Sequence, residues 1–190
     1  LVKAAIGEPI DNESLVGANT HCEISGVTDY KSKDDKAALN KIRSIIDKIG
    51  DQEKAGFNKS ESYPPKENEK EIYGIIPRDR TKPYNMKKII KRLVDKSEFD
   101  EYKENYGKSI ICGYARIEGW AVGIVANQRE MIKTKKGEIQ FGGVIYSDSA
   151  DKSSRFIANC NQKKIPLVFL QDVTGFMVGS RAEHGGIIKD

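Results

Sequence analysis

Residues 165–176 read Ile-Pro-Leu-Val-Phe-Leu-Gln-Asp-Val-Thr-Gly-Phe, and this stretch decides the fold. Its first half, 165–170, is short and wholly apolar, which predicts a strand buried on both faces. It ends at a loop containing Gly175, whose missing Cβ permits backbone angles that other residues avoid. A strand is expected at 141–145 and a helix at about 148–161, and a further helix is expected after the loop. This βαβα order predicts an α/β fold.

Two amphipathic helices are expected nearer the N-terminus. Apolar residues recur with helical spacing over 36–49, where an aspartate at 34 or 35 provides an N-cap and Gly50 a natural stop. The same spacing returns over 86–94 and is preceded by Asn85, a favoured capping residue. Both segments therefore predict helices with one apolar face.

The next segment combines a third expected helix with a hairpin. Ser97 stands three residues before Asp100, a variant of the capping box, so a helix is expected from Ser97 onward. Residues 109–116 and 120–126 are rich in strand-forming residues and are joined at Glu118-Gly119, which predicts a β-hairpin. Between the helix at 36–49 and these elements, residues 51–70 contain many charges and a Pro-Pro pair, which predicts a linker with solvent-facing lysines.

The composition excludes several classes of protein. The 190 residues are 38% hydrophobic and 32% charged, which allows a packed core and excludes collagen-like or wholly disordered chains. The net charge of +4 is too small to indicate nucleic-acid binding by itself. Three widely spaced cysteines and two histidines match no zinc-binding spacing, so we expect reduced thiols and no metal. No apolar run approaches the ~20 residues of a membrane helix.

The strongest candidate for a functional site is the glycine loop after the apolar strand. Once Gly175 bends the chain, the backbone N–H groups of Gly175 and Phe176 can face a ligand, as can those at the start of the next helix. Preorganised N–H groups of this kind stabilise an oxyanion. A plain strand-to-helix turn is the alternative, and the residues alone leave both interpretations open.

Other polar or glycine-rich features favour structural roles. Packing or helix-start roles are expected for a small set of residues: Gly142, Gly143, His21, His184, Asp148 and Asp151. Residues 78–92 are strongly basic but contain only one aromatic residue, Tyr84, so base stacking is poorly supported. A solvated helix face is the favoured interpretation of this basic segment, with phosphate binding as the alternative.

Several long stretches resemble one known family in colinear order. They are LVKAAIGE (1–8), GANTHCEISGVTDY (17–30), DDKAAL (34–39), EIYGIIPRD (71–79), the hairpin region 99–127, the segment 141–160 and the run 165–190. These stretches resemble the carboxyltransferase (beta) subunits of biotin-dependent acyl-CoA carboxylases. Thr174 and the triplet Met177-Val178-Gly179 resemble the methylcrotonoyl-CoA carboxylase branch, because propionyl- and acetyl-CoA enzymes typically carry proline at the first of these positions.

The resemblance implies a crotonase-like (ClpP/crotonase) α/β fold and a domain organisation. Residues 1–52 would be the C-terminal tail of an N-terminal carboxyltransferase domain. Residues 53–70 would be a linker, and 71–190 would be the first half of a C-terminal domain. The acyl-thioester oxyanion loop would precede Leu1 and a second glycine pair of the biotin pocket would follow Asp190, so a fragment of a longer chain is expected, inactive alone.

The resemblance also implies an activity, cofactors and partners. A carboxyl group would move from carboxybiotin to an acyl-CoA, expected to be 3-methylcrotonoyl-CoA in leucine catabolism, in a bacterial cytoplasm or mitochondrial matrix. Biotin would be carried by a biotin carboxylase or biotin carboxyl carrier partner, and further beta subunits would complete an oligomer that binds neither nucleic acid nor membrane. The implied biotin-side oxyanion amides are those of Phe176 and Gly175, and the implied biotin-binding glycines are Gly179, Gly185 and Gly186.

Three alternatives to this function are retained. The first is a propionyl-CoA or other acyl-CoA carboxylase beta subunit. The second is a biotin-dependent acyl-CoA decarboxylase, which runs related chemistry in reverse. The third is a non-catalytic binding module that uses the basic segment 78–92, for which salt-dependent RNA binding would be the signature.

Overall fold

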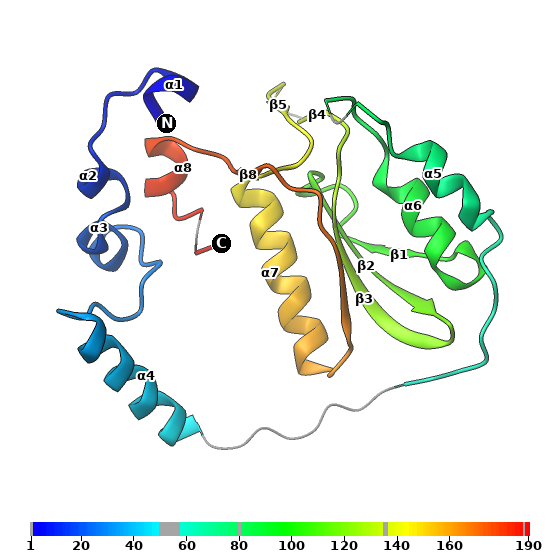
Figure 1. The fold of residues 1–190 in the computed structure, drawn as a ribbon, viewed down its shortest axis with the longest axis horizontal. Coiled ribbons are helices and arrows are strands. Elements are labelled where there is room, and N and C mark those ends of the chain that lie inside the picture. Colours follow the sequence, from blue (N-terminus) through cyan, green and yellow to red (C-terminus); the bar gives the residue numbers. More distant parts are fainter. Residues whose placement is uncertain (1, 50–57, 80, 135–136, 188) are drawn as a thin grey trace. The chain divides into compact units, whose positions relative to one another are not determined.

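In a computed structural model of the chain, the described residues are 2–49, 58–79, 81–134, 137–187 and 189–190. Contacts between residues divide the chain into two compact units. One unit comprises residues 1–54 together with 178–189, and the other comprises residues 55–177 together with Asp190. Figure 1 traces both along the sequence, and each unit is described by itself.

The larger unit is built on a four-stranded sheet with the strand order β1 (Asp100–Tyr102), β2 (Ile110–Ile117), β3 (Trp120–Asn127) and β7 (Leu167–Leu170). Strands β2 and β3 form the predicted antiparallel hairpin, which is thereby confirmed. Strand β7 then runs parallel to β3. The helix α7 (Ser147–Gln162) lies between β3 and β7 in the chain and confirms the helix expected before the apolar strand.

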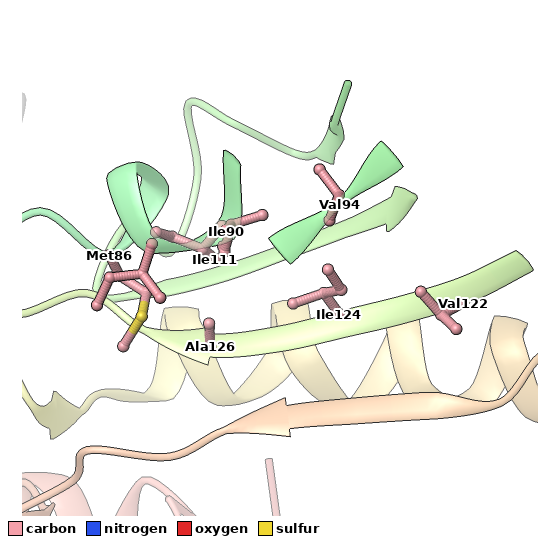
Figure 2. Close-up of a cluster of buried hydrophobic side chains, with 8 residues drawn as sticks. Met86, Ile90, Val94, Ile111, Val122, Ile124 and Ala126 are labelled. Carbon is pink, nitrogen blue, oxygen red and sulfur yellow. The ribbon is translucent and has the colours of Figure 1, made fainter. Parts of the chain in front are cut away.

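Helices α6 and α7 cover opposite faces of this sheet (Figure 1). Alternate residues of a strand point to opposite faces, so Ile111 packs with α6 (Met86–Leu93), whereas Cys112 packs with Phe156 of α7. Figure 2 shows Ile90 of α6 beside Ile111 and Ile124 of the two central strands. Ile90 and Ile124 are fully buried, so one core cluster of this unit lies between α6 and the hairpin, and a second lies between the sheet and α7.

The helix expected after Ser97 is wrong. Residues Asp95–Ser97 form a 3-10 turn, and β1 (Asp100–Tyr102) follows as a strand paired antiparallel with β2. The Ser97 hydroxyl accepts bonds from the backbone N–H groups of Lys66 and Glu67 instead of capping a helix. Phe99 lies over Gly113 of β2, where a side chain would collide with the ring. Strand pairing and this close approach outweigh the local capping pattern.

The structure corrects two of the strand predictions, one in its bounds and one in its burial. The strand expected at 141–145 is reduced to β6 (Val144–Ile145), which pairs in parallel with β8 (Gly175–Phe176). Strand β7 is at the end of the four-stranded order, and Phe169 on it is 56% exposed. The expectation that this strand is buried on both faces is therefore wrong. A small antiparallel pair, β4 (Ile132–Lys133) and β5 (Ile139–Gln140), precedes β6.

Asp95 ties the hairpin to the segment that enters the larger unit. Its buried carboxylate accepts bonds from the backbone N–H groups of Glu118 and Gly119 at 2.8 Å each, and from Tyr63 at 3.3 Å. Glu118 and Gly119 form the two-residue hairpin turn, with φ angles of 49° and 81°. Residues 58–60, within the stretch assigned to a linker, hydrogen bond to Gly119 and Ala121 of this hairpin.

Short helical turns lie at the end of the predicted linker and directly after it. These are a 3-10 turn at Glu69–Glu71 and α5 (Ile72–Ile75). Residues 50–57, where the linker was predicted to begin, lie outside the described part of the chain. The predicted linker and domain boundaries stay a prediction.

The smaller unit is helical in its described residues. It contains α1 (Val2–Ile6), α2 (Asn12–Val16), α3 (Ala18–Glu23), α4 (Asp35–Ile49) and α8 (Ser180–His184). The expected helix at 36–49 is confirmed as α4, and the Asp34 carboxylate accepts a bond from the N–H of Ala37 at 2.7 Å. Within the described residues, no helix is long and apolar enough to cross a membrane.

Candidate functional site

The glycine loop forms a short strand whose pairing directs the Phe176 backbone. Residues 143–145 bond with it on one side, because Thr174 N–H donates to Gly143 O at 2.7 Å and Met177 N–H donates to Ile145 O at 2.8 Å. Successive residues of an extended strand direct their N–H and C=O groups to alternate sides. Ile145 is in register with Phe176 and accepts the bond from the next residue, Met177. In a parallel pair a residue bonds to the neighbours of its register partner, so the N–H and C=O of Phe176 point to the opposite side of β8. Thr174 lies before β8 and does not follow this alternation.

Gly175 contributes the backbone angle that this arrangement needs. Its φ of 153° lies where L-amino acids with a side chain are strained, and no atom lies within 4 Å of the position a Cβ would take. The glycine is therefore required by conformation and not by crowding. Phe176 beside it has a half-exposed side chain, 47% accessible.

The pair Gly142-Gly143 has the packing role that the sequence analysis favours. A Cβ on Gly142 would collide with the Arg129 carbonyl, and one on Gly143 would collide with the Arg129 guanidinium. Gly143 has a φ of 78°, donates its N–H to Gln128 O at 2.9 Å and accepts the bond from Thr174. These glycines let the end of β3 approach the loop closely.

The three other predicted biotin-binding residues lie in the smaller unit. Gly179, with φ of 112°, is the N-cap of α8, Gly185 is its C-cap, and Gly186 follows with φ of 87°. The N–H of Ser180 at the start of α8 donates to the Glu8 carboxylate at 2.9 Å, and hydrogen bonds from Ser180 lower the pKa of Glu8. The helix-start amide expected to face a ligand is thus bonded to a side chain. That Gly179, Gly185 and Gly186 join Gly175 and Phe176 in one pocket stays a prediction.

His21 and the paired aspartates have structural partners, as expected, whereas His184 is the last residue of α8. His21 Nδ1 lies 2.8 Å from Ser25 Oγ, and Ser25 is 6% exposed. Asp148 accepts from Ser149 N–H at 2.8 Å within the first turn of α7, and Asp151 accepts from Tyr106 at 3.4 Å. Within the described residues, no group of His, Cys, Asp and Glu side chains is arranged to hold a metal ion.

Two cations of the basic segment 78–92, Lys87 and Arg92, are paired with acids. Arg92 forms ion pairs with Glu67 and Glu71, and Lys87 pairs with Glu101 at 2.5 Å and Glu104 at 3.3 Å. Paired cations present little net positive charge to a phosphate backbone. The geometry therefore favours a structural role for Lys87 and Arg92.

A polar hollow next to this segment continues into a buried charge network. Its volume is about 380 Å³, and it is lined by Lys87, Lys91, Phe99, Asp100, Glu101 and Glu104. Behind it lies Lys152, fully buried, which donates to Ile110 O at 2.9 Å and is 3.8 Å from Glu101. Burial lowers the pKa of Lys152. Because Lys152 and Glu101 are partnered with each other and with neighbouring groups, this buried pair supports packing of α7 on β2.

Sequence reasoning missed a polar cluster directly ahead of the glycine loop. Asp172 lies at the end of β7 and accepts a hydrogen bond from the Tyr84 hydroxyl at 2.7 Å. Arg129 Nε is 3.4 Å from the same carboxylate, and the Asp172 N–H donates to Asn127 Oδ1 at 3.2 Å. An acidic residue just after a strand can be recognised in the sequence as a candidate site residue. Its partner Tyr84 is 88 residues away in the chain, so the pair cannot be recognised in the same way.

Comparison with known families identifies the class of protein to which this fold and this loop belong. A family model described as the carboxyl transferase domain matches residues 1–190, and the chain belongs to this family. The predicted crotonase-like α/β fold class is thereby confirmed.

The most similar relatives include methylcrotonoyl-CoA carboxylase beta chains. The mitochondrial beta chain of Dictyostelium discoideum is 44% identical over 190 residues, which is all of this chain and 30% of that protein. The biotin-dependent 3-methylcrotonyl-coenzyme A carboxylase beta1 subunit of Mycobacterium tuberculosis is 43% identical over 189 residues, 33% of its length. The chain thus spans about a third of the length of these relatives.

A solved structure supports the same fold. The transcarboxylase 12S crystal structure, described as a hexamer assembly with substrate binding to a multienzyme core, superposes with a TM-score of 0.57 at 32% identity. It matches 98% of this chain and 35% of its own.

Proposed function

We propose that this chain belongs to the carboxyltransferase component of a biotin-dependent acyl-CoA carboxylase, which moves a carboxyl group from carboxybiotin to an acyl-CoA. The observation that carries the proposal is the Phe176 backbone, whose N–H and C=O point away from β6 after a bend that only glycine adopts without strain. Its support from relatives is the identity of 43–44% to beta chains of this enzyme class.

The chemistry proposed for this chain uses backbone groups, not a side-chain nucleophile. Biotin supplies, when bound, the carboxyl group to be transferred and the base that activates the acyl-CoA. The Phe176 N–H donates a hydrogen bond to a developing oxyanion on the biotin side, and a fixed donor does so without reorganisation. Gly175 keeps that N–H aimed by holding its φ at 153°. In this proposal, Gly179, Gly185 and Gly186 contact biotin.

The proposed acyl substrate is 3-methylcrotonoyl-CoA. Thr174 and the triplet Met177-Val178-Gly179 resemble this branch of the family, and both relatives described above act on the methylcrotonoyl group according to their names. Propionyl-CoA is the first alternative substrate.

The proposal includes partners that complete the reaction. A biotin carboxylase or biotin carboxyl carrier subunit delivers carboxybiotin, and further copies of the beta subunit form an oligomer, as transcarboxylase 12S is described as a hexamer assembly. The expected location is the mitochondrial matrix or a bacterial cytoplasm, since the Dictyostelium relative is named as mitochondrial and the other is bacterial.

The test is a carboxyl-transfer assay on the complete gene product that contains residues 1–190. It is incubated with a carboxylated biotin carrier, labelled in the carboxyl group, and with 3-methylcrotonoyl-CoA or propionyl-CoA in parallel. We expect labelled acyl-CoA that depends on the carrier, with 3-methylcrotonoyl-CoA preferred. No transfer to either substrate contradicts the proposal. Sodium-dependent release of carbon dioxide from a carboxylated acyl-CoA, in the presence of membrane partners, would favour the decarboxylase.

A further inference from the structure

The polar cluster before the glycine loop holds the start of that loop from two sides. Strands β3 and β7 are parallel, so their carboxyl ends meet at one edge of the sheet. There the backbone N–H of Asp172 donates to the side chain of Asn127, which is 6% exposed. Asp172, the second residue after β7, is therefore fixed to Asn127, the last residue of β3.

The Asp172 carboxylate makes a second connection, to the segment before α6. Tyr84 donates its hydroxyl proton to Asp172 Oδ2 at 2.7 Å, and its ring packs against the core cluster beneath α6. Burial and the bond to Asp172 raise the pKa of Tyr84, so the hydroxyl remains a donor at neutral pH. A rigid core element thus reaches the loop through one side-chain bond.

Arg129 connects the same carboxylate to the strand that pairs with the loop. Its guanidinium is 3.4 Å from Asp172 and lies against Gly143, where a Cβ would displace it. Gly143 in turn accepts the bond from Thr174, two residues before Phe176. Both strands that frame the loop are therefore anchored around Asp172.

We infer that Asp172, held by Tyr84 and Arg129, is a positioning residue that sets where the Phe176 backbone lies for the biotin-side step; this role rests on the function proposed above. The carboxylate is half exposed, with 47% of its side chain accessible, so its bonds contribute little to global stability. The Asp172 carboxylate acts instead on the position of the loop, and a misplacement of about 1 Å at a reacting group can cost ~10²-fold in rate.

The test compares Tyr84→Phe with Tyr106→Phe in the complete gene product with its biotin carrier. Both substitutions remove a Tyr–Asp hydrogen bond in the same unit, but the Tyr106 bond goes to Asp151 on α7. We expect Tyr84→Phe to lower kcat about tenfold or more, within the range that misplacement produces, with the acyl-CoA KM unchanged. Tyr106→Phe should stay within about twofold, the scale of a neutral surface change.

Hydrogen exchange of the 172–178 peptide, followed by mass spectrometry, supplies a readout independent of turnover. We expect faster exchange of this peptide in Tyr84→Phe than in the wild type or in Tyr106→Phe. Equal exchange in the two variants overturns the inference, as does an active enzyme in which Tyr84→Phe leaves kcat unchanged. A wild type without biotin-dependent transfer contradicts the proposed function instead, and the exchange result then decides alone whether the Tyr84–Asp172 bond places the loop.

Discussion

The core beneath α6 and the loop at 172–177 are held by different physical means. Ile90 and its neighbours are fixed by burial of apolar surface, which tolerates no polar group and is insensitive to small rotations of the backbone. The loop is fixed by single hydrogen bonds from Thr174 and Met177 and by the glycine angle at 175. Substitutions in the core should therefore change stability, whereas substitutions in the loop should change turnover.

The largest expected effect is on stability, from Ile90→Ala. Ile90 is fully buried, so the change leaves a cavity and should lower the free energy of unfolding by ~2–5 kcal/mol. The matched control is Ile46→Ala on α4, where the side chain is 64% exposed and the expected change is within ~0.5 kcal/mol. Urea denaturation measures both. A similar loss in the two variants would show that α4 is packed like α6.

Gly175→Val should lower turnover. A side chain at φ of 153° strains the bend and withdraws the Phe176 donor, so kcat should fall ~10²-fold, the scale of one lost oxyanion donor. Phe176→Leu keeps the N–H and should remain within a few-fold of the wild type. Steady-state kinetics with two acyl-CoA substrates and free biotin measures this. If Gly175→Val raised only the acyl-CoA KM, the assignment of the loop to biotin would be wrong.

Asp95→Asn tests a polar side chain that anchors the hairpin inside the larger unit. The carboxylate accepts three backbone N–H bonds, and an amide group turned toward them loses acceptors, so we expect a loss of ~1–3 kcal/mol. Asp79→Asn is the control, because Asp79 is exposed and its carboxylate accepts bonds from Thr81 within the same turn. Thermal unfolding distinguishes the two, and equal melting temperatures would exclude the anchoring role.

The smallest expected effect is a pH dependence of the core. Burial raises the pKa of Cys112 from 9.0 to about 12, so above pH 9 the unfolded thiol loses its proton while the folded one keeps it. The unfolded state then binds fewer protons, and stability falls as pH rises from about 9 toward 12, by ~1.4 kcal/mol at pH 10. Urea unfolding at pH 8, 9 and 10 should show a shallower decline in Cys112→Ala. Parallel declines would contradict this contribution.

Much of the fold was predictable because local patterns and final packing agree. The hairpin followed from two strand-forming runs around Glu118-Gly119, and α6 followed from apolar spacing after Asn85. The helix expected after Ser97 failed because residues 100–102 pair with β2, a contact that no local pattern reveals. Helix α4 formed as expected, yet its periodicity could not tell that Leu39, Ile42 and Ile46 would each be more than half exposed.

Part of the candidate site could likewise be predicted from the sequence, and part could not. Gly175 could be found from the sequence, because a glycine after an apolar strand is a local signal for an unusual backbone angle. The contacts of Asp172 could not, because Tyr84 and Arg129 reach it from separate elements. Positions that act through distant partners need the folded arrangement before their role can be inferred.

The carboxylate of Asp95 has a consequence for the order of folding. The hairpin turn places a non-glycine residue, Glu118, at a φ of 49°, an angle that glutamate adopts rarely when isolated. Its two turn amides are satisfied by a side chain that follows α6, so the turn is poorly suited to nucleate folding by itself. We expect low φ-values for substitutions at the Glu118-Gly119 turn and higher ones for Ile90 in α6, so that the helix and the strands begin to assemble before the turn closes. Loss of the carboxylate would then accelerate unfolding far more than it slows folding.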